Sequence, residues 1–420
     1  MNNIKKYFNS SILIAGYLSA VLILLFVLIL RSTSKVVFDE RDFMPNFYLM
    51  KKLGFSFDFL KQLKNQSPGP LYQYIYYLMD FFIPVSPKVV RISNYFIYLG
   101  DLYLIYLLLK AETKNGLFVL ALLFTAIPNT VGIAGIGMTE APSLLFCLGA
   151  VLLLKRSLEQ SGPINWALAA LAGVCMGLSI IGRTPFLMVL PAVFVLITKA
   201  DKIMHILLFL IFASVLPLIM FCTWHGLVPP YVQGIQSGYN LFFLFLTIMY
   251  FAINTLIIYP EFFLVKKIHY LIGFLVAIVA LLLNMLVFKV DYTAMNGVVK
   301  TQNSGGIFVT VYRYSFLAFS VGVSYVTLVA FSSYVKKNKP DRWHLFYMLI
   351  CAFILVSTIK SPAHFSSRYV LQAYPFFILY VSRNIKINWL LLFTVIIGTI
   401  IGLTSLINCY AIFAASPYNP

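Results

Sequence analysis

Two adjacent carboxylates stand where the chain leaves its first long apolar run. Asp39 and Glu40 follow apolar residues 11–30 after a short polar stretch, and Asp42 adds a third acid. Carboxylates at the entrance to a helix could act as a general base and its partner. Alternatively, Asp39 or Asp42 caps the following helix and the acids are only solvated. Spacing alone leaves both interpretations open.

A short segment near the C-terminus could bind phosphate. Lys360, His364 and Arg368 are potential cations close together in sequence, and Arg313 lies near the outer end of the predicted helix 308–334. An arginine can hold phosphate oxygens in a bidentate geometry, which a lysine cannot. His364 could also be a zinc ligand, although no second His or Cys stands near it in sequence.

Three further charges interrupt apolar runs. Glu140 opens the run 138–154, where it could also simply complement the helix dipole. Arg183 is the only charge between two apolar runs, and it either snorkels to the lipid headgroups or clamps an anion. Asp101, inside the predicted helix 92–109, could pair across the bundle.

The composition is that of a polytopic membrane protein. Of 420 residues, 61% are hydrophobic and 10% are charged, whereas a soluble domain carries roughly 25% charged residues. The net charge of +18 lies in short loops, which indicates a topology signal rather than nucleic-acid binding. The five cysteines all lie in apolar runs, so neither a disulfide nor a metal site is predicted.

The apolar runs predict an all-α bundle of about thirteen transmembrane helices in a single domain, residues 1–420. The runs lie near 11–30, 92–109, 116–131, 138–154, 165–181, 184–198, 203–223, 238–258, 269–288, 308–334, 343–359, 369–382 and 388–410. The runs 184–198 and 369–382 carry the weakest signal.

Basic residues predict the orientation. With the N-terminus in the cytoplasm, every inner segment holds at least two Lys or Arg, sixteen in all, whereas the short outer loops after the first hold five in all and two of them hold none. The long loop 31–91 then faces the extracytoplasmic side, as do the acids at its start. It is expected to be structured, with helices near 39–53, 55–64 and 71–82.

No nucleotide-binding or HExxH motif is present, so an enzyme of this kind would take an activated substrate from the membrane. Several short motifs occur in a characteristic order. They are Phe38-Asp39-Glu40, Tyr48, Lys51-Lys52-Leu53-Gly54, Ser67-Pro68-Gly69-Pro70-Leu71-Tyr72, Met138-Thr139-Glu140, Gly182-Arg183-Thr184-Pro185 and Ser367-Arg368-Tyr369.

This order resembles that of the GT-C superfamily of membrane glycosyltransferases, which includes protein O-mannosyltransferases and bacterial aminoarabinose transferases. The surroundings of Asp39 and Arg183 are also similar to dolichol-linked alpha-1,2-glucosyltransferases. The chain departs from relatives in having Pro68-Gly69-Pro70 where many have Pro-Pro, and in lacking the C-terminal soluble domain that many carry.

The resemblance implies a GT-C-like bundle and transfer of a sugar from a polyprenyl-phosphate donor to a lipid, glycan or protein acceptor on the extracytoplasmic side. Asp39 and Glu40 would be catalytic. Arg368, Lys360, His364, Arg183 and Arg313 would bind the donor phosphate, with Asp42, Tyr72, Glu140 and Tyr369 nearby. Inversion is expected, no cofactor is certain, and a divalent metal could assist the leaving phosphate.

Two other classes share this composition. A membrane oligosaccharide polymerase or ligase would place its large outer loop late in the chain, whereas here the large loop comes first. A lipid or sugar transporter would show internal repeats and helices broken at matching positions, and the sequence shows neither.

Overall fold

The computed structural model describes residues 2–66, 68–110, 117–159, 163–234, 238–290, 307–360 and 365–415. The side chains of residues 2–9, 117, 163 and 307–313 are not described. Within the described residues the chain is helical throughout and contains no strand.

Ten helices of the described part are long and apolar enough to cross a membrane. They are α1 (Asn2–Leu30), α5 (Pro87–Lys110), α8 (Glu140–Glu159), α9 (Pro163–Gly182), α11 (Ala200–Trp224), α13 (Leu241–Ile258), α14 (Lys267–Leu283), α16 (Ile307–Asn338), α17 (Arg342–Ser357) and α19 (Trp389–Ala415). The chain is therefore an integral, multi-pass, all-helical membrane protein.

The described residues form fewer membrane spans than the thirteen expected, because three of the apolar runs are bent or short. In the run 116–131, α6 (Leu117–Leu122), η1 (Leu123–Ala126) and α7 (Pro128–Gly135) turn through 85°. Pro128 explains the break, since proline cannot continue a helix. Counting this pair as one span gives eleven.

The other two runs are the ones with the weakest sequence signal. Residues 184–196 form three short helices in series, η2 (Thr184–Met188), α10 (Val189–Ala192) and η3 (Val193–Leu196). The run 369–382 becomes η7 (Ser367–Ala373) followed by α18 (Tyr374–Val381), which carries Pro375 in its first turn. Every residue of α18 is buried, so protein rather than lipid surrounds it.

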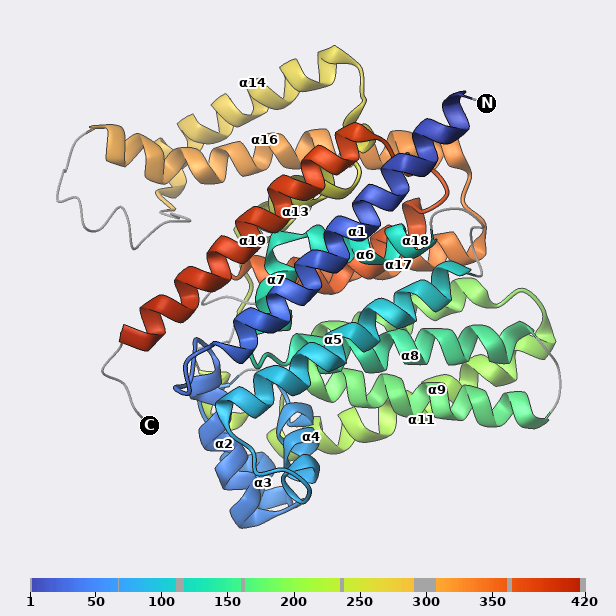
Figure 1. Cartoon of the computed structure of the whole chain (residues 1–420), viewed down its shortest axis with the longest axis vertical. Coiled ribbons are helices and arrows are strands. Elements are labelled where there is room, and N and C mark those ends of the chain that lie inside the picture. The colour runs from blue at the N-terminus through green and yellow to red at the C-terminus, as the bar shows by residue number, and fades with distance from the viewer. Residues whose placement is uncertain are drawn as a thin grey trace.

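Three sets of neighbouring long helices can be followed around this buried centre (Figure 1). Helices α5, α8, α9 and α11 pack as neighbours on one side, while α1 and α19 run together across the bundle. Helices α14 and α16 form a separate pair at the edge, where Gly273 and Gly322 bring the two backbones close together.

Three helices from the first long loop cover the end of the bundle where α1 stops (Figure 1). They are α2 (Glu40–Leu53), α3 (Phe57–Gln62) and α4 (Leu71–Asp80), at the positions expected from the sequence. Helix α2 buries Phe43, Phe47 and Met50 at helical spacing and exposes Lys51 and Lys52. The loop is thus packed onto the bundle by one apolar stripe.

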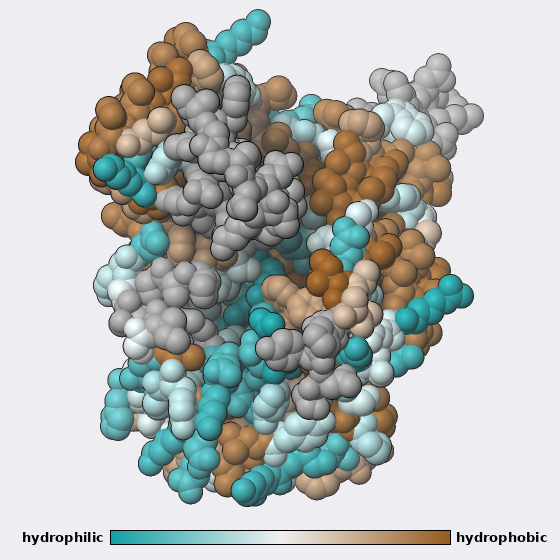
Figure 2. All heavy atoms as spheres, turned by 90° about the vertical axis from the view of Figure 1, so that its left-hand side faces the viewer, coloured by the Kyte–Doolittle hydropathy of each residue, from teal (hydrophilic) through white to brown (hydrophobic). Residues whose placement is uncertain are grey.

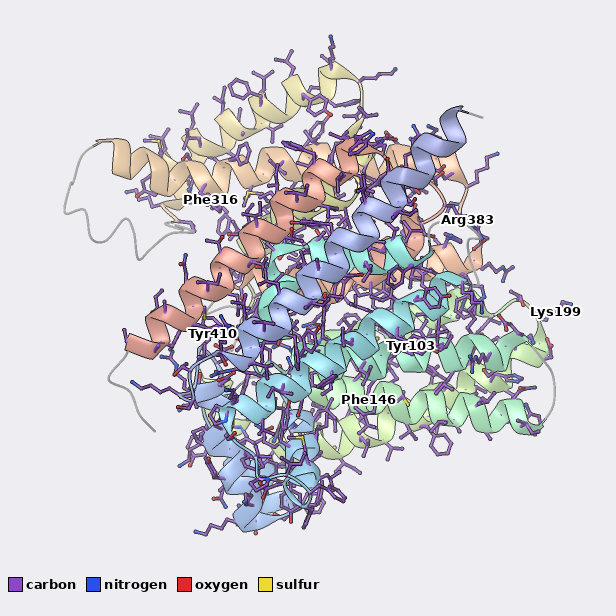
Figure 3. The ribbon with its side chains drawn as sticks, viewed as in Figure 1. Tyr103, Phe146, Lys199, Phe316, Arg383 and Tyr410 are labelled. Atoms are coloured by element: carbon purple, nitrogen blue, oxygen red, sulfur yellow. The ribbon has the colours of Figure 1, made fainter. Side chains whose placement is uncertain are left out.

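Segments assigned to the cytoplasm by the sequence gather at the opposite end. Arg342 Nη1 donates to the carbonyl oxygen of Ile197 at 2.8 Å, and Arg383 pairs with Asp341 at 3.0 Å. Figure 3 shows Lys199 and Arg383 at this end, away from Tyr410. The grouping agrees with the alternation of basic residues, and the orientation in the membrane stays a prediction from charge.

Candidate active site

A partly exposed charged pair at the α2–α4 end joins two predicted site residues that are far apart in sequence. Nη2 of Arg368 donates to Oδ2 of Asp39 at 2.7 Å, and the two side chains are 19% and 30% exposed. Figure 2 views the molecule from the left-hand side of Figure 1. It shows hydrophilic side chains over the lower part of this face, extending toward a hollow at its centre. A water-soluble or headgroup-level reactant could therefore reach the pair.

Glu140 links a second arginine to the first. At the start of α8, its Oε1 forms an ion pair with Nη2 of Arg183 and lies 3.6 Å from Nη1 of Arg368. Both Glu140 and Arg183 are buried. The structure thus brings together four residues that the sequence had singled out separately, in the order Asp39, Arg368, Glu140 and Arg183.

The two arginines are close enough to repel each other. Burial and the charge of Arg368 lower the pKa of Arg183 to about 10. The guanidinium still carries its proton at neutral pH. The charges of the two arginines and of Asp39 and Glu140 balance, so an anion such as a phosphate would bind here by taking over guanidinium donors that now face the carboxylates.

Aromatic rings surround the arginines. The Phe38 ring lies 4.9 Å from Cζ of Arg368, and the Tyr369 ring lies 5.9 Å from Cζ of Arg183. Phe38 has a φ of 52°, a left-handed conformation that is uncommon for a bulky residue and costs about 1–3 kcal/mol. The strained residue immediately precedes Asp39, so the local backbone sets the direction of that carboxylate.

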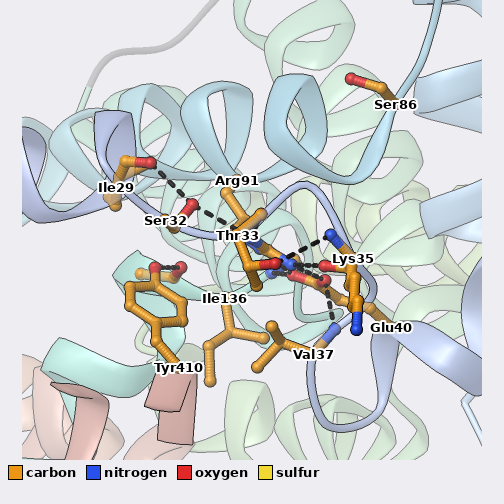
Figure 4. A network of polar contacts seen from close by, with 12 residues as sticks. Ile29, Ser32, Thr33, Lys35, Val37, Glu40, Ser86, Arg91, Ile136 and Tyr410 are labelled. Atoms are coloured by element: carbon orange, nitrogen blue, oxygen red, sulfur yellow. Dashed lines mark hydrogen bonds and ion pairs between the residues drawn. The ribbon is translucent and has the colours of Figure 1, made fainter. Parts of the chain in front are cut away.

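Glu40 has a different environment from its neighbour (Figure 4). It is fully buried and forms a bidentate pair with Arg91 of α5, from Nε to Oε1 at 2.8 Å and from Nη2 to Oε2 at 2.6 Å. The backbone N–H groups of Val37 and Gly137 donate to the same oxygens at 2.8 and 2.9 Å. Each oxygen of Glu40 therefore accepts two hydrogen bonds.

Arg91 is equally well satisfied. Nη1 donates to the Ser32 hydroxyl at 3.0 Å and to the Thr33 carbonyl at 2.6 Å, while Nη2 also donates to the Lys35 carbonyl at 2.5 Å. The pair fixes the segment between α1 and α2 against α5 and α7. This geometry favours a positioning role for Glu40 and leaves Asp39 as the accessible carboxylate.

The proline-rich turn packs directly against the segment that carries Arg183. A Cβ on Gly69 would overlap the carbonyl oxygen of Ile181, and a Cβ on Gly182 would overlap the Ser143 hydroxyl. Only glycine permits the turn and α9 to approach this closely. The glycine that distinguishes this turn from the Pro-Pro of the resembling enzymes thus has a packing reason.

Other predicted residues lie at varying distances from the four-residue cluster. Tyr72 is buried beside Glu40, and its pKa is raised well above the usual value by burial. Burial also raises the pKa of Asp42, against the lowering effect of Arg41. The Lys360 ammonium lies 4.3 Å from the ring centre of Tyr239 rather than in the cluster.

Two predicted phosphate ligands are not placed by the structure. His364 lies outside the described residues, and the same is true of the side chain of Arg313. The divalent metal that the resemblance allows has no ligand group here, since no three His, Cys, Asp or Glu side chains of the described part lie together. Asp39 and Glu140 are instead paired with arginines.

Sequence reasoning did not identify Arg91 as part of this region. Arg91 is the last residue of the predicted loop 31–91, whereas the helix that contains it begins earlier, at Pro87. A charged residue followed by an apolar run on the same helix is a signal for a buried pair.

Comparisons with protein-family models, curated proteins and solved structures found no match.

Proposed function

We propose that the protein is an integral-membrane glycosyltransferase that moves a sugar from a polyprenyl-phosphate donor to a lipid, glycan or protein acceptor. The observation that supports this best is the contact of Asp39 with Arg368, beside a second arginine, at the accessible end of the bundle. A carboxylate base and a phosphate clamp are the two elements that this transfer needs.

The geometry suggests the following sequence of events. The donor phosphate binds Arg368 and Arg183 and weakens the hold of Arg368 on Asp39. The acceptor hydroxyl oxygen attacks the anomeric carbon while Asp39 accepts its proton. The bond from the anomeric carbon to the phosphate oxygen breaks, its electron pair stays on the phosphate, and the anomeric centre inverts. The arginines stabilise the growing phosphate charge.

A lateral groove suits the polyprenyl chain of the donor. It has a volume of about 730 Å³ between α13, α14 and α16, and apolar residues line most of it. Tyr239, which carries Lys360 over its ring, belongs to the lining. A basic residue at the rim of an apolar groove complements a lipid with an anionic phosphate, and we assign the donor lipid to it.

Ring contacts connect this groove to the arginine cluster. Phe243, the residue after the lining residue Phe242, contacts Phe365 with ring centres 5.6 Å apart, and Phe365 contacts Tyr369 at 6.4 Å. Tyr369 in turn lies against Arg183. A lipid bound in the groove would therefore extend toward Arg183 and Arg368, the proposed binding site of its phosphate.

Mass spectrometry of cell-envelope glycans and lipid-linked sugars tests the proposal. Cells that carry Asp39→Asn in place of the wild-type protein should lose one sugar modification and accumulate the corresponding polyprenyl-phosphate sugar. Cells with Asp58→Asn, an exposed acid of α3, serve as the control and should resemble the wild type. Unchanged glycans and lipids with Asp39→Asn would rule out this function.

A further inference from the structure

A second polar group lies inside the bundle, next to the arginine cluster. Asp101 of α5 is fully buried, and neither carboxylate oxygen has a hydrogen-bond partner in the described structure. Gln372 of η7 is 1% exposed, and neither its amide oxygen nor its amide nitrogen has a partner there. The expected pairing of Asp101 across the bundle is therefore absent from the described residues.

The two side chains face a common cavity. Its volume is about 10 Å³, and Tyr98 and Glu140 also line it. A space of this size holds about one water molecule, provided that polar groups surround it. Four unpaired polar atoms on Asp101 and Gln372 meet that condition, because leaving such groups dry and unpaired is costly.

Glu140 offers the third partner. Its Oε1 is occupied by the two arginines, whereas its Oε2, among the described residues, has only a long contact of 3.5 Å with the Thr139 hydroxyl. An acceptor position on Oε2 is therefore free to receive a hydrogen bond from the cavity. The Tyr98 hydroxyl is already paired with Thr125 at 3.0 Å and does not compete.

We propose that Asp101, in its neutral protonated form, and Gln372 hold one water molecule that donates to Glu140. A carboxylate buried without any cation is strongly disfavoured, whereas a neutral carboxyl group can donate to the water. The water then fixes the rotation of the Glu140 carboxylate, and with it the two guanidiniums. Asp101 and Gln372 are positioning residues for the arginine cluster, a role that rests on the proposed function.

Infrared spectroscopy of the full-length protein in detergent tests the water site without any activity assay. The wild type should show the carbonyl stretching band of a protonated buried carboxyl group, and Asp101→Asn should lack it. Replacing sodium by choline should change neither this band nor the melting temperature. A missing band would show that Asp101 is ionised, and a wild-type melting temperature that rises with sodium but not in Asp101→Asn would show a cation site; either result would overturn the proposal.

Titration with undecaprenyl phosphate tests the positioning role. Asp101→Asn keeps the shape and can still donate, so its Kd should stay within about twofold of the wild type. Asp101→Leu and Gln372→Met remove the water contacts at similar volume, and should weaken binding about tenfold, as expected for a lost charge-assisted hydrogen bond. Wild-type affinity in both apolar variants would disprove positioning. If the wild type itself does not bind, the proposed function fails, and the infrared result still decides the water site.

Discussion

The buried pair of Glu40 and Arg91 provides the sharpest prediction about stability. Both side chains are 0% exposed, and they share two hydrogen bonds. Removing one partner of such a pair leaves an uncompensated buried charge, which costs about 3–5 kcal/mol. Arg91→Leu should therefore lower the free energy of unfolding by about this amount. Only two backbone N–H groups would remain to satisfy Glu40.

Removing both charges should cost less than the sum of the single changes. The double variant Glu40→Leu/Arg91→Leu leaves no unpaired charge, so a double-mutant cycle should give a coupling energy of about 1–3 kcal/mol. The assay is reversible denaturation in detergent, followed by helical signal. Glu159→Gln, at an exposed position at the end of α8, is the matched control and should change the unfolding free energy by less than about 0.5 kcal/mol.

One pattern of results would refute this reasoning. Glu40→Gln keeps the size of the side chain but places an amide donor next to the donors of Arg91, so it should destabilise the protein. If Glu40→Gln unfolds like the wild type and yet abolishes sugar transfer, Glu40 takes part in the chemistry. The structural role inferred from its four hydrogen bonds would then be wrong.

Three further predictions concern the clamp, the turn and the topology. Arg368→Ala should reduce kcat/KM for the polyprenyl-phosphate donor at least tenfold. Arg368→Lys should recover only part of this kcat/KM, because lysine cannot bind a phosphate bidentately. Full recovery by lysine would place Arg368 at the lipid headgroups instead. Gly69→Ala should destabilise the protein in thermal unfolding, since the added methyl group overlaps the Ile181 carbonyl; an unchanged melting temperature would contradict that packing. A cysteine at Lys61 should react with an impermeant thiol reagent in intact cells while one at Lys337 should not, and the reverse labelling would invert the topology.

Much of the architecture could be predicted because hydropathy and helical period are local properties. The long spans and the helices of the first loop lie where apolar periodicity indicates them. The span count could not be predicted from local hydropathy. Pro128 and Pro375 lie within apolar runs, and the surrounding helices bury the short segments that result, so lipid length does not limit them.

The site could be predicted residue by residue but not as an arrangement. Asp39, Glu140, Arg183 and Arg368 each stood out as charges beside apolar runs, and three-dimensional packing alone shows that they form one chain of contacts. Neighbours in sequence can also point to different environments. Asp39 faces solvent and Arg368, while Glu40 faces Arg91 inside the protein.

If Asp39 acts in the chemistry and Arg368 binds the donor, native mass spectrometry of the purified protein should separate the two roles. The Asp39→Asn protein should retain a co-purified polyprenyl-phosphate sugar, because it binds the donor but cannot accept the acceptor proton. The Arg368→Ala protein should carry little or none. A bare Asp39→Asn protein, or equal donor occupancy in Arg368→Ala, would contradict the account.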